Sequence, residues 1–206
     1  MAAGFDQQDV EILSETLAYD GFFKLKALRL RHRLFGGGWS PVIDRELSLR
    51  KDAVGVLLYD PQAGCFALVE QLRIGALGRE RSPWLLELVA GMLDKPDEDA
   101  QAVAHRETRE EAGLALLALE PVCRYFCSPG GSNERFTLYC GRVALAGVSG
   151  GVFGVDGEHE DIRLHILPVE EVLARLASGE IDNAMSIIAL QWFQLNRQRL
   201  DALWHD

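Results

Sequence analysis

The sequence predicts an α/β protein: an α/β/α sandwich around a mixed sheet, with a small antiparallel layer at its N-terminus. Three mostly apolar runs, 53–60, 65–73 and 83–91, are typical of strands buried on both faces. The segments 97–112, 168–179 and 182–204 have the apolar spacing and the end signals of helices. Because strands and helices mix without strict alternation, one mixed sheet between layers of helices is expected.

The first fifty residues predict the small layer. Residues 1–20 are polar and are expected to begin with a frayed end. Alternating apolar residues over 22–35 indicate a half-exposed strand with a bulge at Ala27/Leu28, and 42–50 indicates a second strand after a GGGWSP turn. We therefore divide the chain into an N-terminal layer, 1–50, and a main domain, 51–206. The layer has too little apolar area to stand alone and is expected to pack on a neighbour.

The main domain continues with strands and two further helices. Strands are expected near 121–127, 135–145 and 161–167, with a Gly/Ser-rich loop, 146–159, before the last of them. The helix over 97–112 is stopped by Gly113, a residue suited to the left-handed cap position. Pro168 begins the next helix and Gly179 follows its end.

Composition narrows the class of protein. The chain has 206 residues, 48% of them hydrophobic and 25% charged, which fits one large globular domain with a small extension. A net charge of −10 argues against a nucleic-acid partner. No apolar run approaches the ~18 residues of a membrane span, and acids stand where a signal peptide would carry basic residues. The cysteines, which form no CxxC pair, are interpreted as reduced core thiols of a cytoplasmic protein.

The stretch 91–114, GMLDKPDEDAQAVAHRETREEAGL, is the most informative. On a helix, Glu107, Glu110 and Glu111 fall in the sector that Ala100, Val103 and Ala104 use for packing. Arg106 and Arg109 are expected to point away from that sector. Clustered carboxylates without His or Cys then need a cation, and such oxygen ligands suit Mg²⁺ or Mn²⁺. The alternative is a solvated acidic helix face, which is what most such runs are.

These residues give the chain its resemblance to a known family. Gly91, Glu98, Arg106, Glu107, Glu110, Glu111, Gly113 and Leu114 resemble the box of the Nudix hydrolases, G-x5-E-x7-R-E-U-x-E-E-x-G-U with U apolar. Two departures are a gap of six residues between Gly91 and Glu98 and a threonine, Thr108, at the first U position. Stretches such as 70–77, 83–92, 128–134, 160–165 and 180–195 extend the resemblance to the bacterial ADP-ribose pyrophosphatases.

The resemblance implies roles for residues around the metal. It implies that Glu107, Glu111, Glu160 and the carbonyl of Ala90 ligate the ion and that Glu110 is a shared or outer ligand. It further implies that Glu158, in the Gly-rich loop, is the general base. His159 is the rival base because an imidazole titrates near neutral pH, and residue type alone does not order Glu158 and Glu160. The Glu98–Arg106 ion pair is implied to orient the helix.

Substrate contacts are implied in the same way. Phe22, Arg45 and Glu46 match residues that surround an adenine, and Arg73 matches an arginine that binds the pyrophosphate through its planar fork. Met92, Ser132 and Glu134 are further implied contacts, with the last two facing sugar hydroxyls. Each residue has a structural alternative: strand core for Phe22, edge or strand-end charge for Arg45 and Arg73, and a tight connection for 128–134.

The expected function is Mg²⁺-dependent hydrolysis of ADP-ribose to AMP and ribose 5-phosphate. The expected assembly is a homodimer with exchanged N-terminal layers, in which the largely apolar final helix either takes part or is ordinary core. Another nucleoside diphosphate sugar or a dinucleotide, such as GDP-mannose or NADH, is the nearest alternative substrate. A non-catalytic ADP-ribose sensor on the same fold is the alternative from another class, and the retained carboxylates weigh against it.

Overall fold

The computed structural model describes residues 4–79, 82–95, 97–155, 157 and 159–204. Chain contacts divide it into two units: unit 1 comprises residues 1–51 and 126–135, and unit 2 comprises 52–125 and 136–206. The 126–135 connection, which the sequence placed in the main domain, therefore joins the N-terminal residues. None of the described helices is long and apolar enough to cross a membrane.

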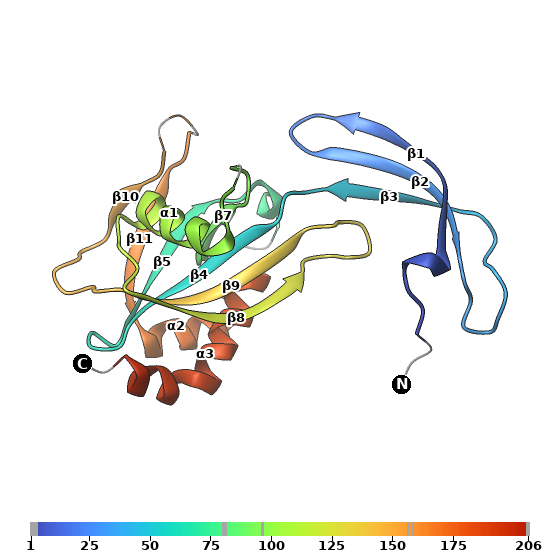
Figure 1. Cartoon of the computed structure of the whole chain (residues 1–206). Coiled ribbons are helices and arrows are strands. Elements are labelled where there is room, and N and C mark those ends of the chain that lie inside the picture. Colours follow the sequence, from blue (N-terminus) through green and yellow to red (C-terminus); the bar gives the residue numbers. More distant parts are fainter. Residues whose placement is uncertain (1–3, 80–81, 96, 156, 158, 205–206) are drawn as a thin grey trace. The chain divides into compact units, whose positions relative to one another are not determined.

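Unit 1 contains a three-stranded antiparallel sheet. Its strands, in the order β1-β2-β3, are β1 (Val10–Asp20), β2 (Lys24–His32) and β3 (Ile43–Leu49), as Figure 1 shows. The prediction of a polar start missed β1. The register shifts lie in β1, where Leu13 and Ala18 are the extra residues, and not at Ala27/Leu28 in β2. An extra residue bulges the strand that carries it, so the bulge prediction was wrong about the strand.

Unit 2 is built around an eight-stranded mixed sheet. The bounds of its strands are β4 (Ala53–Asp60), β5 (Cys65–Leu72), β6 (Trp84–Glu87), β7 (Val89–Met92), β8 (Ala118–Phe126), β9 (Arg135–Arg142), β10 (Gly151–Phe153) and β11 (Ile162–Pro168). The main order is β10-β11-β5-β4-β9-β8. β4 pairs with β9 in parallel, whereas the pairings among β4, β5, β6, β7, β10 and β11 are antiparallel.

The apolar run 83–91 forms two strands and not one. β6 pairs with the far end of β5, and β7 pairs with the beginning of β4, with Leu88 between them. β4 and β5 pair with each other only at 58–60 and 65–67. The chain that runs from β6 to β7 therefore bridges the splayed ends of two central strands.

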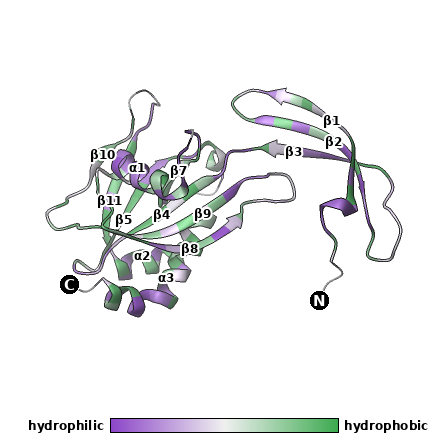
Figure 2. Ribbon diagram, viewed as in Figure 1, coloured by the Kyte–Doolittle hydropathy of each residue, from purple (hydrophilic) through white to green (hydrophobic). Residues whose placement is uncertain are grey.

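Helices cover both faces of this sheet, as predicted (Figure 1). α1 (Ala100–Ala112) packs on β4, β5 and β7, while α2 (Val169–Ala177) and α3 (Ala184–Leu203) lie on the other face. One apolar cluster, with Val54, Val56 and Val103, lies under α1; another, with Leu57, Tyr59 and Phe193, lies under α3. Figure 2 shows the contrast between hydrophobic β4 and the hydrophilic α1.

The structure also tests the predicted bounds of α1, the predicted loop 146–159 and the predicted burial of the cysteines. α1 begins at Ala100 with Asp99 as its N-cap, three residues later than predicted, and Gly113 ends it with φ +64°. β10 was missed inside the Gly/Ser-rich loop because only three residues form it. Cys140 is buried as expected for a core thiol, but Cys127 is exposed.

Candidate active site

The carboxylates of α1 meet the sheet at β7. Glu111 is only 3% exposed, and its Oε2 accepts a hydrogen bond of 3.0 Å from the backbone N–H of Ala90. Glu107 lies one turn earlier and against Gly91: a Cβ at this glycine would overlap the Glu107 carboxylate. The glycine is therefore required by close approach, which the motif alone does not reveal. These contacts place two glutamates directly over β7.

The helical projection predicted that Arg106 points away from the acidic sector, and this prediction was wrong. Its Nη1 donates to Glu107 at 2.5 Å and to Glu110 at 2.9 Å. Its Nε and Nη2 donate to the two carboxylate oxygens of Glu98 at 2.9 and 3.1 Å. A long arginine can curl back over its own helix, so an angular projection of Cα positions places its guanidinium wrongly.

The longer loop before α1 does not prevent the Glu98–Arg106 ion pair. Asp97 adopts a left-handed backbone with φ +64°. Such a turn residue accommodates the chain just before the pair, and aspartate tolerates this conformation better than most residues. The other departure, Thr108, is fully buried, and its hydroxyl donates to the carbonyl of Ala104 at 2.7 Å. A threonine is thus accepted at an apolar position because its hydroxyl is satisfied locally.

Burial changes the acidity of both glutamates. Burial raises the pKa of Glu107 to about 7, opposed by the adjacent Arg106 guanidinium. It raises the pKa of Glu111 to about 8, opposed by the hydrogen bond from Ala90. The negative charge of Glu160 raises both pKa values further. A low-dielectric site with mutually repelling carboxylates favours a bound cation or a bound proton.

The loop acids are only partly within the described structure. Glu160 is half-buried, and its Oε2 accepts a hydrogen bond of 3.3 Å from the backbone N–H of Val155. His159 has a left-handed backbone with φ +55°. Glu158, the predicted base, lies outside the described residues.

The donor set fits a hard divalent cation in its chemistry. Glu107, Glu111 and Glu160 offer carboxylate oxygens, which Mg²⁺ and Mn²⁺ prefer. Among the described residues, no three His, Cys, Asp or Glu side chains are already gathered closely enough to hold a metal ion. The carboxylate of Glu107 is instead neutralised by Arg106, which supplies in this arrangement part of the positive charge that the cluster needs.

Arg73 lies in unit 2 and has a partner that the sequence analysis missed. It follows β5, and its Nε donates to Oε2 of Glu87 at 2.6 Å. The Glu87 side chain is 7% exposed and the Arg73 side chain 39%. A single acid inside the apolar run 83–91 was the available signal, because a buried carboxylate needs a specific partner. Met92 ends β7, and its carbonyl accepts a 3.5 Å hydrogen bond from Arg106.

The other predicted substrate contacts belong to unit 1. Phe22 is 82% exposed in the turn between β1 and β2 and makes an edge contact with Phe23. Arg45 and Glu46 are exposed on β3. The exposure of Phe22 argues against its alternative role as strand core.

The connection 128–134 is well fixed within unit 1. Glu134 pairs with Arg50 at 3.1 Å, and the hydroxyl of Ser132 accepts a hydrogen bond of 3.2 Å from the Glu134 N–H. Asn133 bonds the backbone of Arg50 in both directions. Both polar side chains predicted to meet sugar hydroxyls therefore already have partners, as the alternative of a tight connection requires.

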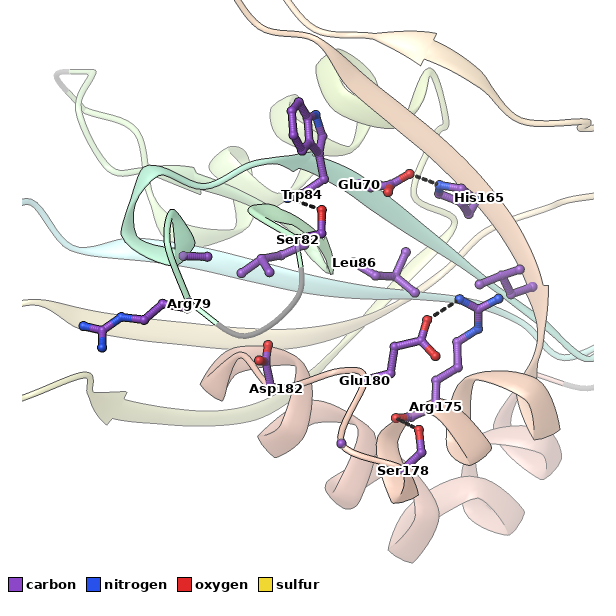
Figure 3. Close-up of a pocket in the computed structure, with 14 residues that line it drawn as sticks. Glu70, Arg79, Ser82, Trp84, Leu86, His165, Arg175, Ser178, Glu180 and Asp182 are labelled. Carbon is purple, nitrogen blue, oxygen red and sulfur yellow. Dashed lines mark hydrogen bonds and ion pairs between the residues drawn. The ribbon is translucent and has the colours of Figure 1, made fainter.

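A cavity of about 800 Å³ lies beside β6 on unit 2 (Figure 3). Glu70 and His165 form a 2.8 Å contact in its wall, and Arg175 donates to Glu180 at 2.7 Å. Its described lining includes none of the α1 carboxylates. The cavity and the α1 carboxylates are therefore separate features of unit 2.

Comparison with known proteins shows the family of the chain. The NUDIX domain model matches residues 49–193. The "ADP-ribose pyrophosphatase" of Haemophilus influenzae is 44% identical over 97% of this chain and 93% of its own length. The protein of that name from Escherichia coli K12 is 43% identical, over 97% and 95%.

A second group of relatives carries another name. The "GDP-mannose pyrophosphatase" of Pectobacterium atrosepticum is 32% identical over 88% of this chain and 92% of its own. A solved structure described as "ADP compounds hydrolase" superimposes with a TM-score of 0.71 at 17% identity, covering 98% of this chain and 100% of that one, which shows a shared fold. From the family match and the near-complete coverage by its relatives, the chain belongs to the NUDIX domain family.

Proposed function

We propose that the protein hydrolyses the pyrophosphate of ADP-ribose, in which water adds to one phosphorus and the bond to the bridging oxygen breaks, giving AMP and ribose 5-phosphate. The observation that carries the proposal is the pair of carboxylates, Glu107 and Glu111, that lie against β7, with the negative charge of Glu160 acting on both. The substrate is taken from the names of relatives at 43–44% identity.

The ion that we propose is Mg²⁺, with Mn²⁺ as a substitute, held by Glu107, Glu111, Glu160 and the carbonyl of Ala90. A bound divalent cation neutralises phosphate oxygens and acidifies a bound water. An acidic protein with net charge −10 needs such a counter-charge to bring a diphosphate to its carboxylates. Support from the structure is the raised pKa of Glu107 and Glu111, since buried carboxylates gain most from a nearby cation.

The chain's own groups do the remaining work. We propose that Glu158 takes the proton from the attacking water, with His159 as the alternative base, and that Glu110 is shared between Arg106 and the metal shell. Arg106 then orients Glu107 and Glu110 through its short contacts while Glu98 holds its other edge. A positioned base contributes about 10²–10⁴-fold in rate.

Substrate recognition is proposed for the residues that the resemblance implies. Phe22 offers an exposed ring for stacking on adenine, and Arg45 and Glu46 offer exposed polar groups on the same sheet. Arg73 offers a guanidinium for the diphosphate. Ser132, Glu134 and Met92 are proposed as further contacts. For Glu134, a sugar contact would have to share the carboxylate with Arg50.

The direct test is release of the nucleoside monophosphate by purified protein with Mg²⁺: AMP from ADP-ribose and NADH, and GMP from GDP-mannose. We expect kcat/KM to be highest for ADP-ribose. A preference for GDP-mannose would favour the second group of relatives, whose sequence likeness to this chain is 32% in one member. Tight binding of ADP-ribose without formation of product in the presence of Mg²⁺ or Mn²⁺ would favour the alternative of a non-catalytic ADP-ribose sensor.

We further propose that the protein is a cytoplasmic homodimer that exchanges its N-terminal layers. The sheet of unit 1 leaves β1 exposed along almost its whole length, with apolar Ile12, Leu13 and Leu17 at its surface. Apolar area of this kind is commonly covered by a partner. Light scattering should give twice the 22.8 kDa of one chain, and a mass of 22.8 kDa at micromolar concentration would refute the dimer.

A further inference from the structure

We infer that Glu87 is a positioning residue that aims the Arg73 guanidinium at the diphosphate of the substrate. This inference rests on the proposed function, because it takes Arg73 as the residue that binds the diphosphate. It adds a residue to which neither the motif nor the resemblance gave a role.

Glu87 occupies a buried position, where a carboxylate is unfavourable unless a cation lies beside it. It ends β6, pairs with Val69 of β5 and is followed by Leu88, which is fully buried. The residue itself is only 5% exposed. Removing a carboxylate from water is unfavourable by several kcal/mol, so the residue stays ionised only beside a well-placed cation. That cation is Arg73, whose Nε lies 2.6 Å from Oε2 of Glu87.

The hydrogen bond to Glu87 uses the Nε edge of the Arg73 guanidinium and leaves its terminal nitrogens available. Among the residues that the structure describes, the hydrogen bonds of the Arg73 side chain involve Nε alone, so Nη1 and Nη2 remain for a ligand. The two terminal nitrogens of Arg73 can meet two phosphate oxygens as a fork.

Both partners are fixed through their backbones. The N–H of Arg73 donates to the carbonyl of Pro83 at 2.7 Å, which ties the end of β5 to the chain entering β6. The amide of Asn183 donates to the carbonyl of Leu86 at 3.0 Å, which holds the exit of β6. An arginine with four rotatable side-chain bonds is thus reduced to few orientations by a fixed carboxylate, and preorganisation of this kind lowers the loss of entropy on binding.

The test is a double-mutant cycle with steady-state kinetics on ADP-ribose at saturating Mg²⁺. Glu87→Gln should raise KM about tenfold and leave kcat within about twofold, because it weakens binding that ground state and transition state share. Arg73→Ala should raise KM more. The double variant should match Arg73→Ala, since Glu87 acts only through Arg73. Glu70→Gln, a β5 carboxylate bonded to His165, is the matched control and should keep wild-type constants.

Two results would overturn the inference. One is an unchanged KM in folded Glu87→Gln; the other is a Glu87→Gln effect that persists undiminished in the Arg73→Ala background, which would mark Glu87 as merely structural. If Glu87→Gln does not fold, Glu87→Asp replaces it: withdrawing the carboxylate by one methylene should raise KM about threefold, and an unchanged KM would refute the inference.

Failure of the proposed function gives a different result. In that case the wild-type protein releases no AMP from ADP-ribose. The cycle is then run on whichever diphosphate of the panel the wild-type protein hydrolyses, because Arg73 meets the diphosphate that all of them share.

Discussion

The contacts of single residues decide what the acidic cluster can do. Arg106 joins Glu98, Glu107 and Glu110 in one network, so the helix carries its own counter-charge. Glu111 is outside this network and is held instead by the N–H of Ala90. Glu111 is only 3% exposed, and burial raises its pKa further than that of Glu107. Glu111 is therefore the residue whose loss should affect the reaction most selectively.

Glu111→Gln should lower kcat by about 10²-fold or more, because an amide is a poor metal ligand and the stabilisation of developing phosphoryl charge is lost. The fold should survive, since the glutamine oxygen can still accept from Ala90. Glu171→Gln, which removes an exposed helix glutamate bonded to Arg175, is the matched control. Near-wild-type turnover of Glu111→Gln would count against the metal assignment.

Gly91→Ala tests the packing of the motif glycine. The added Cβ would overlap the Glu107 carboxylate, so the side chain must move from its place over β7. We expect kcat to fall at least about tenfold, as for other displacements of a reacting group, and stability to fall by about 1–3 kcal/mol. Gly36→Ala is the control, because a Cβ there meets nothing within 4 Å. Equal activity of both variants would show that the Glu107 side chain can accommodate a Cβ at position 91 without loss of function.

At the scale of elements, the sequence predicted the strands and helices that contribute residues to the core and missed a strand that contributes none. β4, β5 and α1 were found because their apolar residues enter the two buried clusters. β1 was missed because ten of its eleven residues are exposed, so its sequence carries no burial pattern. The strand is held by pairing with β2, which leaves no periodicity to read.

The site was predictable to the same degree. The spacing of the glutamates indicated which side of α1 carries them, and the structure places Glu111 and Glu107 against β7. The direction of Arg106 and the partner of Arg73 depend on side-chain rotamers and on strands distant in sequence, which spacing does not encode. For the partner of Arg73, the signal in the sequence was Glu87, the single acid in the apolar run 83–91.

The N-cap of α1 gives a prediction for the element. The side chain of Asp99 accepts a 2.8 Å hydrogen bond from the N–H of Ala102, and this N–H has no partner within the helix. Asp99→Ala should lower the free energy of unfolding by about 1 kcal/mol. Urea denaturation should show it, while Gln101→Ala, at an exposed position of the same helix, should cause no loss. Equal stability of both variants would mean that the cap contributes nothing.

At the scale of the whole molecule, the acidic cluster should link stability to pH. The pKa of Glu111 is about 8 in the folded protein, against an ordinary glutamate value of 4.5, so between these pH values the folded state binds more protons than the unfolded chain. The metal-free protein therefore loses this contribution to stability as pH rises from about 5 to about 8.

Thermal unfolding in the presence of a chelator tests this linkage. Glu111→Gln has no carboxylate to ionise, so its Tm relative to wild type should be higher at pH 8 than at pH 5. Added Mg²⁺ should raise the wild-type Tm more at pH 8, where the ligands are ionised, than at pH 5. A difference in Tm that is the same at both pH values would show that Glu111 does not titrate in this range.

The most direct measurement is hydrolysis of ADP-ribose by the wild-type protein before and after exhaustive removal of divalent cations. Our proposal is that the carboxylates beside β7 act on a diphosphate through a metal ion. It predicts that turnover falls by about 10²-fold or more after chelation and returns when Mg²⁺ is added. Full turnover in the chelated protein would contradict the account.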